Sequence, residues 1–275
     1  MIYLYAYTNH KDGLDSLRRV KVIYDALKEQ GIEASLVLNE FRAQLLAKEW
    51  GLPKGLTVEN VNEMIHIAKR GDVIVVDTNE EFLEILLDFA KDTAIIYLNS
   101  SCKEKSYPNI ITVDLFKDGA LYPKIAQSTT QNEHIALVFK DSDYEKILLQ
   151  YLDSIDTKKM DLYWGIYFFV KYEEKLKKYF NSIIESENYY EILQNYNFFV
   201  TASQQIAIEA KANNKAVIFL NLKKENNQCI DFIRNIGIKV VNDFNDISFD
   251  NKKTKENINI NNKLFKIIDI INKNM

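Results

Sequence analysis

The run Asp72–Asp77, with the sequence Asp-Val-Ile-Val-Val-Asp, decides the fold class of this chain. Four consecutive apolar residues between two acids leave no polar face, which is typical of a strand covered on both sides. Strands of this kind belong to parallel sheets that carry helices on both faces. The run therefore predicts an α/β protein built on a parallel sheet.

Strands and helices alternate along the rest of the chain. Leu17, Val20, Tyr24 and Leu27 follow spacings of three and four, which predicts a helix with one buried stripe, and Gly31 is placed to end it in a left-handed conformation. Similar patterns predict helices around 58–68, 82–89, 144–155, 189–196, 203–213, 228–236 and 264–271. Apolar segments predict strands at 1–7, 34–38, 94–98, 110–113, 135–139, 162–170, 198–201, 216–220 and 238–241.

This order predicts two Rossmann-like domains with parallel sheets and right-handed crossovers. We expect the first domain over 1–130, the second over 131–250, and a linker with a C-terminal helix over 251–275. Ligands of open parallel sheets bind beyond the carboxyl ends of the strands. The expected ligand site is therefore the cleft between the two domains.

Composition argues against several classes of protein. A net charge of −4, with lysines spread among acids, argues against a nucleic-acid binder, which needs a basic face. No apolar run reaches membrane-spanning length and the N-terminus lacks a secretory signal pattern, so we expect a cytoplasmic protein.

Cys102 and Cys229 are expected to be reduced thiols. Neither they nor the 3 histidines have metal-site spacing, and no metal or cofactor is expected.

Three motifs carry a resemblance to a known superfamily. Gly13–Arg19, Gly-Leu-Asp-Ser-Leu-Arg-Arg, resembles a Gly-x-Gly-His-x-x-Arg motif at the first strand-to-helix turn. Val200–Ala210 resembles a Thr-Ser-Gly-Gly run followed by Glu-Ala, and Glu225–Gln228 resembles an Asn-Gln pair after the following strand. With the order of elements, these motifs make most of the chain similar to the GT-B superfamily, in particular to the UDP-sugar hydrolases of pseudaminic acid biosynthesis.

The resemblance implies a GT-B-like pair of domains that holds a UDP-sugar in the cleft, and cleavage of that sugar by water without a metal. It implies that Glu209 accepts hydrogen bonds from the ribose of a uridine nucleotide. The implied partner is a nucleotide-sugar or nucleotide, and the implied setting is surface-glycan or flagellin glycosylation. The implied substrate contacts are Gly13, Ser16, Arg19, Ser142, Ser203, Gln204, Glu209, Asn227 and Gln228.

The chain departs from the family motifs at three turns. Asp15 replaces a glycine, and Ser16 replaces a histidine that family members use as a base; a hydroxyl does not take up a proton at neutral pH as imidazole does. Ser203 and Gln204 replace a glycine pair, and Lys140–Asp143 replaces a Gly-Gly-Thr/Ser-Asp loop. With 8 glycines in the chain, side chains stand where a diphosphate would approach bare backbone.

His10 and Asp77 are the candidates for the missing catalytic base. His10 lies in the loop after the first strand, where the alternative is an exposed histidine without a chemical role. Asp77 ends a buried strand and would accept a proton or a sugar hydroxyl. The alternative for Asp77 is to cap a helix beginning near Glu80.

Other polar and aromatic residues have two interpretations each. Arg18 and Arg19 either bind a phosphate over the first helix or are solvated in its first turn. Asp15 and Ser16 cap that helix in the structural interpretation. The aromatic residues of 163–169 either stack on a ligand or fill the core around a buried strand.

Three functions are compatible with these patterns. The first is a nucleotide-sugar hydrolase or glycosyltransferase with a substituted base. The second is a binding module that keeps the nucleotide site but has lost catalysis. The third is a catalytically inactive scaffold that acts through protein–protein interaction. Fold alone does not separate these functions. The retained Glu209 and Gln228 favour a protein that binds a nucleotide-sugar, and the inactive scaffold is the alternative.

Overall fold

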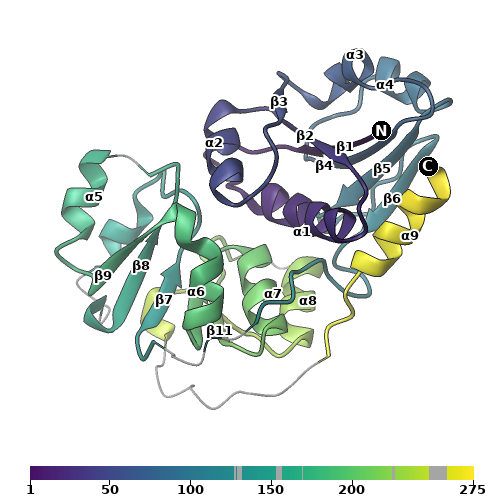
Figure 1. Ribbon diagram of the computed structural model, residues 1–275. Coiled ribbons are helices and arrows are strands. Elements are labelled where there is room, and N and C mark those ends of the chain that lie inside the picture. The colour runs from purple at the N-terminus through teal and green to yellow at the C-terminus, as the bar shows by residue number, and fades with distance from the viewer. Residues whose placement is uncertain (127, 129–131, 153–156, 169, 225–226, 248–258) are drawn as a thin grey trace. The chain divides into compact units, whose positions relative to one another are not determined.

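The chain forms two compact units, each built on one parallel sheet (Figure 1). The computed structural model describes residues 1–275 except 127, 129–131, 153–156, 169, 225–226 and 248–258. The first unit comprises Met1–Asn9, Leu14–Leu121 and Asn261–Met275. The second comprises His10–Gly13 and Tyr122–Ile260. The prediction of an α/β fold with two parallel sheets is confirmed.

The first unit has six strands in the order β3-β2-β1-β4-β5-β6, all parallel. The run that decided the fold class is β4, in the interior of the sheet, and its apolar residues are at most 1% exposed. The strands are β1 (Ile2–Ala6), β2 (Ala34–Leu38), β3 (Leu56–Thr57), β4 (Val73–Asp77), β5 (Ala94–Asn99) and β6 (Ile110–Asp114). The helices are α1 (Asp15–Glu29), α2 (Phe41–Glu49), η1 (Val61–Glu63), α3 (Met64–Ile67), α4 (Glu84–Phe89) and α9 (Leu264–Asn274).

Helix α1 shows how local sequence and packing agree. Leu17, Val20 and Leu27 are fully buried on one stripe, each worth about 1.5–3 kcal/mol of burial. Gly31 follows the helix at φ +72°, and the N–H of Ile32 donates to the carbonyl of Leu27, so the predicted left-handed helix end is confirmed. Helix α9 contacts α1, while η1, α3 and α4 line the core on the opposite face of the sheet.

The second unit repeats the design with strands in the order β12-β11-β10-β7-β8-β9, again all parallel. Its strands are β7 (Ile135–Val138), β8 (Met160–Trp164), β9 (Ser182–Glu185), β10 (Phe198–Thr201), β11 (Ala216–Leu220) and β12 (Lys239–Val241). Its helices are η2 (Ile147–Gln150), η3 (Thr157–Lys159), α5 (Val170–Leu176), η4 (Ser186–Asn188), α6 (Tyr189–Asn195), α7 (Gln204–Ala212), α8 (Gln228–Asn235) and η5 (Phe244–Asp246).

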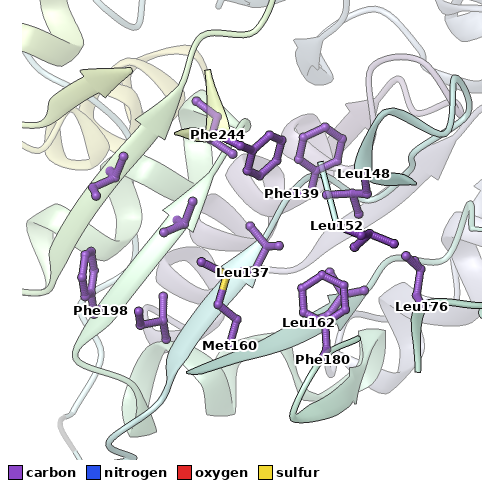
Figure 2. Close-up of a cluster of buried hydrophobic side chains, with 14 of the residues drawn as sticks. Leu137, Phe139, Leu148, Leu152, Met160, Leu162, Leu176, Phe180, Phe198 and Phe244 are labelled. Carbon is purple, nitrogen blue, oxygen red and sulfur yellow. The ribbon is translucent and has the colours of Figure 1, made fainter. Parts of the chain in front are cut away.

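One face of this second sheet packs under η2, α5 and η5 (Figure 2). Strand residues Leu137 and Leu162 meet Leu148 from η2 and Leu176 from α5, and all four are at most 1% exposed. Aromatic residues of the predicted 163–169 cluster join the core, since Phe168 is buried within it and Trp164 packs against it. The core interpretation agrees with the structure for the described aromatics, while Phe169 lies outside the described residues.

Two sequence expectations in the second unit are wrong. The described part of 144–155 forms one short 3₁₀ turn, η2, instead of a helix, and Lys146 before it has φ +54°. The strand predicted to reach residue 170 ends at Trp164, because Gly165 lies against the backbone of Asp141. Patterning also missed the short elements α2, β3 and β9 and the 3₁₀ helices η3, η4 and η5.

Neither cysteine is a free thiol, so the expectation of two reduced thiols is wrong. Across the described residues, no helix combines the length and apolar character needed to cross a bilayer. The cytoplasmic location stays a prediction.

Candidate functional site

Each sheet has one point where chain connections leave in opposite directions. In the first unit it lies between β1 and β4, and in the second between β7 and β10. Loops that follow the two strands diverge there, and ligands of open α/β sheets bind beyond the carboxyl ends of the strands at such points. The candidate sites are therefore the loops at these two switch points. The predicted site in a cleft between the domains stays a prediction.

Ser142 lies at the switch point of the second unit. It follows β7, and the loop after neighbouring β10 runs beside it, since the N–H of Ala202 donates to the carbonyl of Phe139 over 2.9 Å. Ser142 is 7% exposed, and its Oγ finds no hydrogen-bond partner in the described part of the chain. A buried hydroxyl without a partner costs free energy. A ligand oxygen at this point would satisfy it.

Helix α7 begins at the same switch point. Ser203 is its N-cap: the hydroxyl accepts from the N–H of Ile206 at 3.1 Å, and the Ser203 N–H donates to Thr201 Oγ1 at 3.0 Å. Gln204 is the first helical residue and is half-buried. The predicted contact Ser203 therefore has a structural duty, while the positive end of the α7 dipole is directed to this edge of the sheet.

Glu209, the predicted ribose acceptor, is fully buried in α7. Its Oε2 accepts from the hydroxyl of Tyr189 at 2.6 Å, and its Oε1 accepts from the amide of Gln205 at 2.8 Å. Both carboxylate oxygens are thus engaged inside the second unit. Each oxygen has two lone pairs, so a ligand hydroxyl would have to share or replace one of these donors.

The acidic loop Lys140–Asp143 is held from several sides. A Cβ on Gly13, which has φ +78°, would lie 2.7 Å from Asp141 Oδ2, so the predicted contact Gly13 faces an acid. Asp143 accepts from the N–H groups of Ile147 and Leu148 at 2.8 and 3.0 Å and from the hydroxyl of Tyr172. Burial raises the pKa of Asp143 despite these donors. Asp143 therefore acts as a cap of η2.

The third motif is only partly described. Asn227 is the N-cap of α8 and accepts from the N–H groups of Cys229 and Ile230 at 3.1 and 3.2 Å. Gln228 is exposed as the first residue of the helix. Glu225 and Asn226 lie outside the described residues. The motif thus provides a helix cap beside an exposed amide.

Asp77 and Arg19 form a buried ion pair at the switch point of the first unit. The Nε and Nη2 atoms of Arg19 donate to the two carboxylate oxygens at 2.6 and 2.9 Å, and Nη2 also reaches Ser100 Oγ at 3.3 Å. Asp77 does not cap a helix, because α4 begins at Glu84. Arg19 is therefore buried in an ion pair and not solvated in the first turn of α1, while its contact with a phosphate stays a prediction.

The remaining predicted residues lie around the loop after β1. His10 is exposed, and its ring centre is 4.9 Å from that of Tyr144. The hydroxyl of Ser16 donates to the carbonyl of Tyr7 at 2.8 Å, and Asp15 pairs with fully buried Arg18 at 3.1 Å. Ser16 thus ties α1 to the preceding loop, but the N-cap position itself is Leu14.

Sequence reasoning missed Glu80, in the loop after β4. Its Oε2 accepts from the hydroxyls of Tyr5 and Thr78 at 2.6 and 2.9 Å and from the N–H of Val61 at 3.2 Å. Burial outweighs these three bonds and raises the pKa of Glu80 above its usual value. The available signal was the position of an acid three residues after a buried strand at a switch point.

Glu80→Gln is expected to raise the stability of the first unit near pH 7 and to flatten its pH dependence. Because the folded pKa exceeds the unfolded value of 4.5, the contribution of this carboxyl is complete below that value and is lost as pH rises through the folded pKa. Glutamine keeps an acceptor oxygen and carries no charge. Urea unfolding at about pH 4 and about pH 7 gives the free energy of unfolding of the parent and the variant. If that free energy falls between the two pH values as much in the variant as in the parent, or more, the prediction is contradicted.

Within the described ranges, no group of three or more His, Cys, Asp and Glu side chains is arranged to hold a metal ion. The polar groups at the two switch points are instead hydroxyls, amides, carboxylates paired with donors, and a helix N-terminus. Such groups bind ligands by hydrogen bonds and by the helix dipole.

Several solved structures resemble the chain over nearly its whole length. A putative UDP-N-acetylglucosamine 2-epimerase from Listeria monocytogenes aligns with 99% of this chain and 94% of its own, at a TM-score of 0.55 and 10% identity. The fold is of the GT-B type. A UDP-GlcNAc 2-epimerase from Neisseria meningitidis, bound to UDP-GlcNAc, aligns with 99% of this chain and 100% of its own, at a TM-score of 0.52 and 9% identity. No family model and no curated protein matches.

Proposed function

We propose that this GT-B chain binds a nucleotide or nucleotide-sugar, with the phosphates at the switch point between β7 and β10. The observation that carries the proposal is the Ser142 hydroxyl, which is buried and finds no partner among the described residues, in the loop after β7 whose start is hydrogen-bonded to the segment that precedes α7. A phosphate oxygen would accept from this hydroxyl and would be stabilised by the helix dipole. Gln204, at the first position of α7, supplies a further donor.

In the proposed site, Glu209 acts first as a positioning residue. It holds Tyr189 and Gln205 through both carboxylate oxygens. Direct acceptance of ribose hydroxyls, which the family resemblance implies, would use the remaining lone pairs of that carboxylate. Asn227 and Gln228 complete the proposed nucleotide contacts at the start of α8. Uridine is the proposed base on the resemblance to UDP-sugar hydrolases.

Binding is better supported than catalysis. Asp77, one candidate base, is held by two hydrogen bonds from Arg19, and His10, the other, is an exposed loop residue. Asp141 also places a buried acid beside the proposed phosphate loop, and like charge weakens anion binding. If the protein is active, the proposed reaction is metal-free hydrolysis or transfer of a UDP-linked sugar in surface-glycan or flagellin glycosylation.

Ser142→Ala is expected to weaken UDP binding about tenfold while leaving stability unchanged or slightly higher. The hydroxyl has no partner to lose in the described chain, but a bond to a charged phosphate would be lost. Calorimetric titration with UDP, together with thermal unfolding, measures both quantities. Parent protein that does not bind UDP, or a variant that binds it equally well, contradicts the proposed site.

Thr93→Val provides the matched control for that experiment. Thr93 is 4% exposed, and its Oγ1 is likewise buried without a partner in the described residues, but it precedes β5 in the first unit. Removing this hydroxyl should leave UDP affinity unchanged. An equal loss of affinity in both variants would indicate a general effect of core substitution.

An inactive scaffold is the second candidate function. Phe41 and Leu45 lie one turn apart on α2 and are 66% and 53% exposed, and Leu56 on the edge strand β3 is 49% exposed. Gln44 donates to the carbonyl of Leu56, which joins these elements. Exposed apolar patches favour protein contacts. Concentration-dependent self-association that Phe41→Glu abolishes, without any UDP binding, would favour this function.

A further inference from the structure

The carboxylate of Glu80 is fixed at the switch point of the first unit by one of its two oxygens. Oε2 accepts from Tyr5 on β1, from Thr78 in its own loop and from Val61 at the start of η1. Because these three donors come from three separate segments, they hold the Glu80 carboxylate in one orientation. Tyr5 belongs to β1 and the loop follows β4, so the group joins the two strands on either side of the switch point.

The other oxygen of Glu80 is left open. Oε1 has no hydrogen-bond partner among the described residues, and the side chain is half-buried. Burial raises the pKa of this carboxyl, because the half-buried side chain is less well solvated than a free one. A partly buried carboxylate gains more from an external donor than a fully solvated one does.

The charges around Glu80 select the kind of ligand. Glu63 acts electrostatically on Tyr5, and exposed Glu81 follows Glu80 directly. Arg19, a basic group at the same switch point, is neutralised by Asp77. An anionic ligand would meet repulsion here, while a neutral hydroxyl or an ammonium group would donate to the open oxygen.

We propose that Glu80 Oε1 is the acceptor of a second ligand site, at the β1–β4 switch point, that takes a neutral or cationic compound bearing hydroxyl or amine donors, such as an amino sugar. This site lies wholly within the first unit and does not depend on nucleotide binding by the second. The anchored oxygen positions the carboxylate, and the open oxygen binds the donor.

Three sugars of similar shape and different charge test this site: D-glucosamine, N-acetyl-D-glucosamine and D-glucuronate. Ligand-observed NMR titrations with the full chain are expected to give the affinity order cationic, neutral, anionic. In Glu80→Gln the affinity for glucosamine should fall about tenfold and the order should collapse, because the charge-assisted bond is lost. Glutamine keeps an oxygen for Tyr5, Thr78 and Val61, so the variant should fold.

Glu84→Gln is the control, since it removes the same charge from an exposed residue at the start of α4. It should retain the parent order of affinities. Parent protein that binds none of the three sugars at about 50 mM, a concentration that detects very weak sites, overturns the proposal. So does an equal effect of the two substitutions. UDP binding should be unchanged in Glu80→Gln, so failure of this site is separable from failure of the nucleotide site.

Discussion

Asp77→Ala is expected to lower the free energy of unfolding of the first unit by about 3–5 kcal/mol. The side chains of Asp77 and Arg19 are 1% and 5% exposed and are joined by hydrogen bonds of 2.6 and 2.9 Å. Removing the carboxylate leaves a guanidinium in a low-dielectric site without its counter-charge. Urea unfolding followed by the fluorescence of Trp50 in a Trp164→Phe background reports on this unit, since the chain has 2 tryptophans.

The exposed pair of Arg70 and Asp92 provides the control for this prediction. Its N–O distance is 3.0 Å, but the side chains are 80% and 53% exposed. Because solvent screens such a pair, Asp92→Ala should lower the free energy of unfolding by less than about 1 kcal/mol. Equal losses for the two variants would mean that Asp77 is not a structural counter-ion, and would revive its interpretation as a free base.

Gly165→Ala is expected to destabilise the second unit by about 3 kcal/mol, at the upper end of the cost of overpacking. A Cβ at this position would lie 2.2 Å from the carbonyl oxygen of Asp141 and 2.3 Å from its carbonyl carbon. These are backbone atoms, so no side-chain rotation relieves the clash. The backbone is also tied here by a bond from the N–H of Tyr167 to the same oxygen, 3.0 Å long.

Gly31→Ala separates steric crowding from backbone strain. Gly31 has φ +72°, and a Cβ there meets nothing within 4 Å, so its cost should be the left-handed conformation alone, about 1–2 kcal/mol. Urea unfolding followed by circular dichroism compares the variants. A Gly165→Ala loss no larger than that of Gly31→Ala would show that the loop of Asp141 moves freely. In that case the Asp141 side chain would also be free to move away from a phosphate bound at the β7–β10 switch point.

Most of the secondary structure follows from patterns of neighbouring residues. The apolar run 72–77 and the helix end at Gly31 are both where the sequence predicts them. The prediction failed at 144–155, where the apolar spacing is helical. There the carboxylate of Asp143 takes the N–H groups of Ile147 and Leu148, and a hydroxyl from distant Tyr172 fixes it. A tertiary hydrogen bond thus overrode the local pattern.

The candidate sites were less accessible to sequence reasoning. Asp77 and Arg19 were each named as ligand-facing, but they bind each other across 58 positions of the chain. Glu209 was named for an external ligand, and its nearest donors are Tyr189 and Gln205. Glu80 was considered only as a helix start. Polar residue types reveal hydrogen-bonding capacity, but not which partner from elsewhere in the chain satisfies it.

The sequence by itself determined two parallel α/β sheets, because hydrophobic periodicity and glycine placement are properties of adjacent residues and act through local conformation and burial. Only the tertiary structure decided which polar atoms remain available to a ligand. Ser142 Oγ and Glu80 Oε1 are two polar atoms that find no hydrogen-bond partner among the described residues. That property depends on how strands and loops distant in sequence converge at each switch point, which no local pattern encodes.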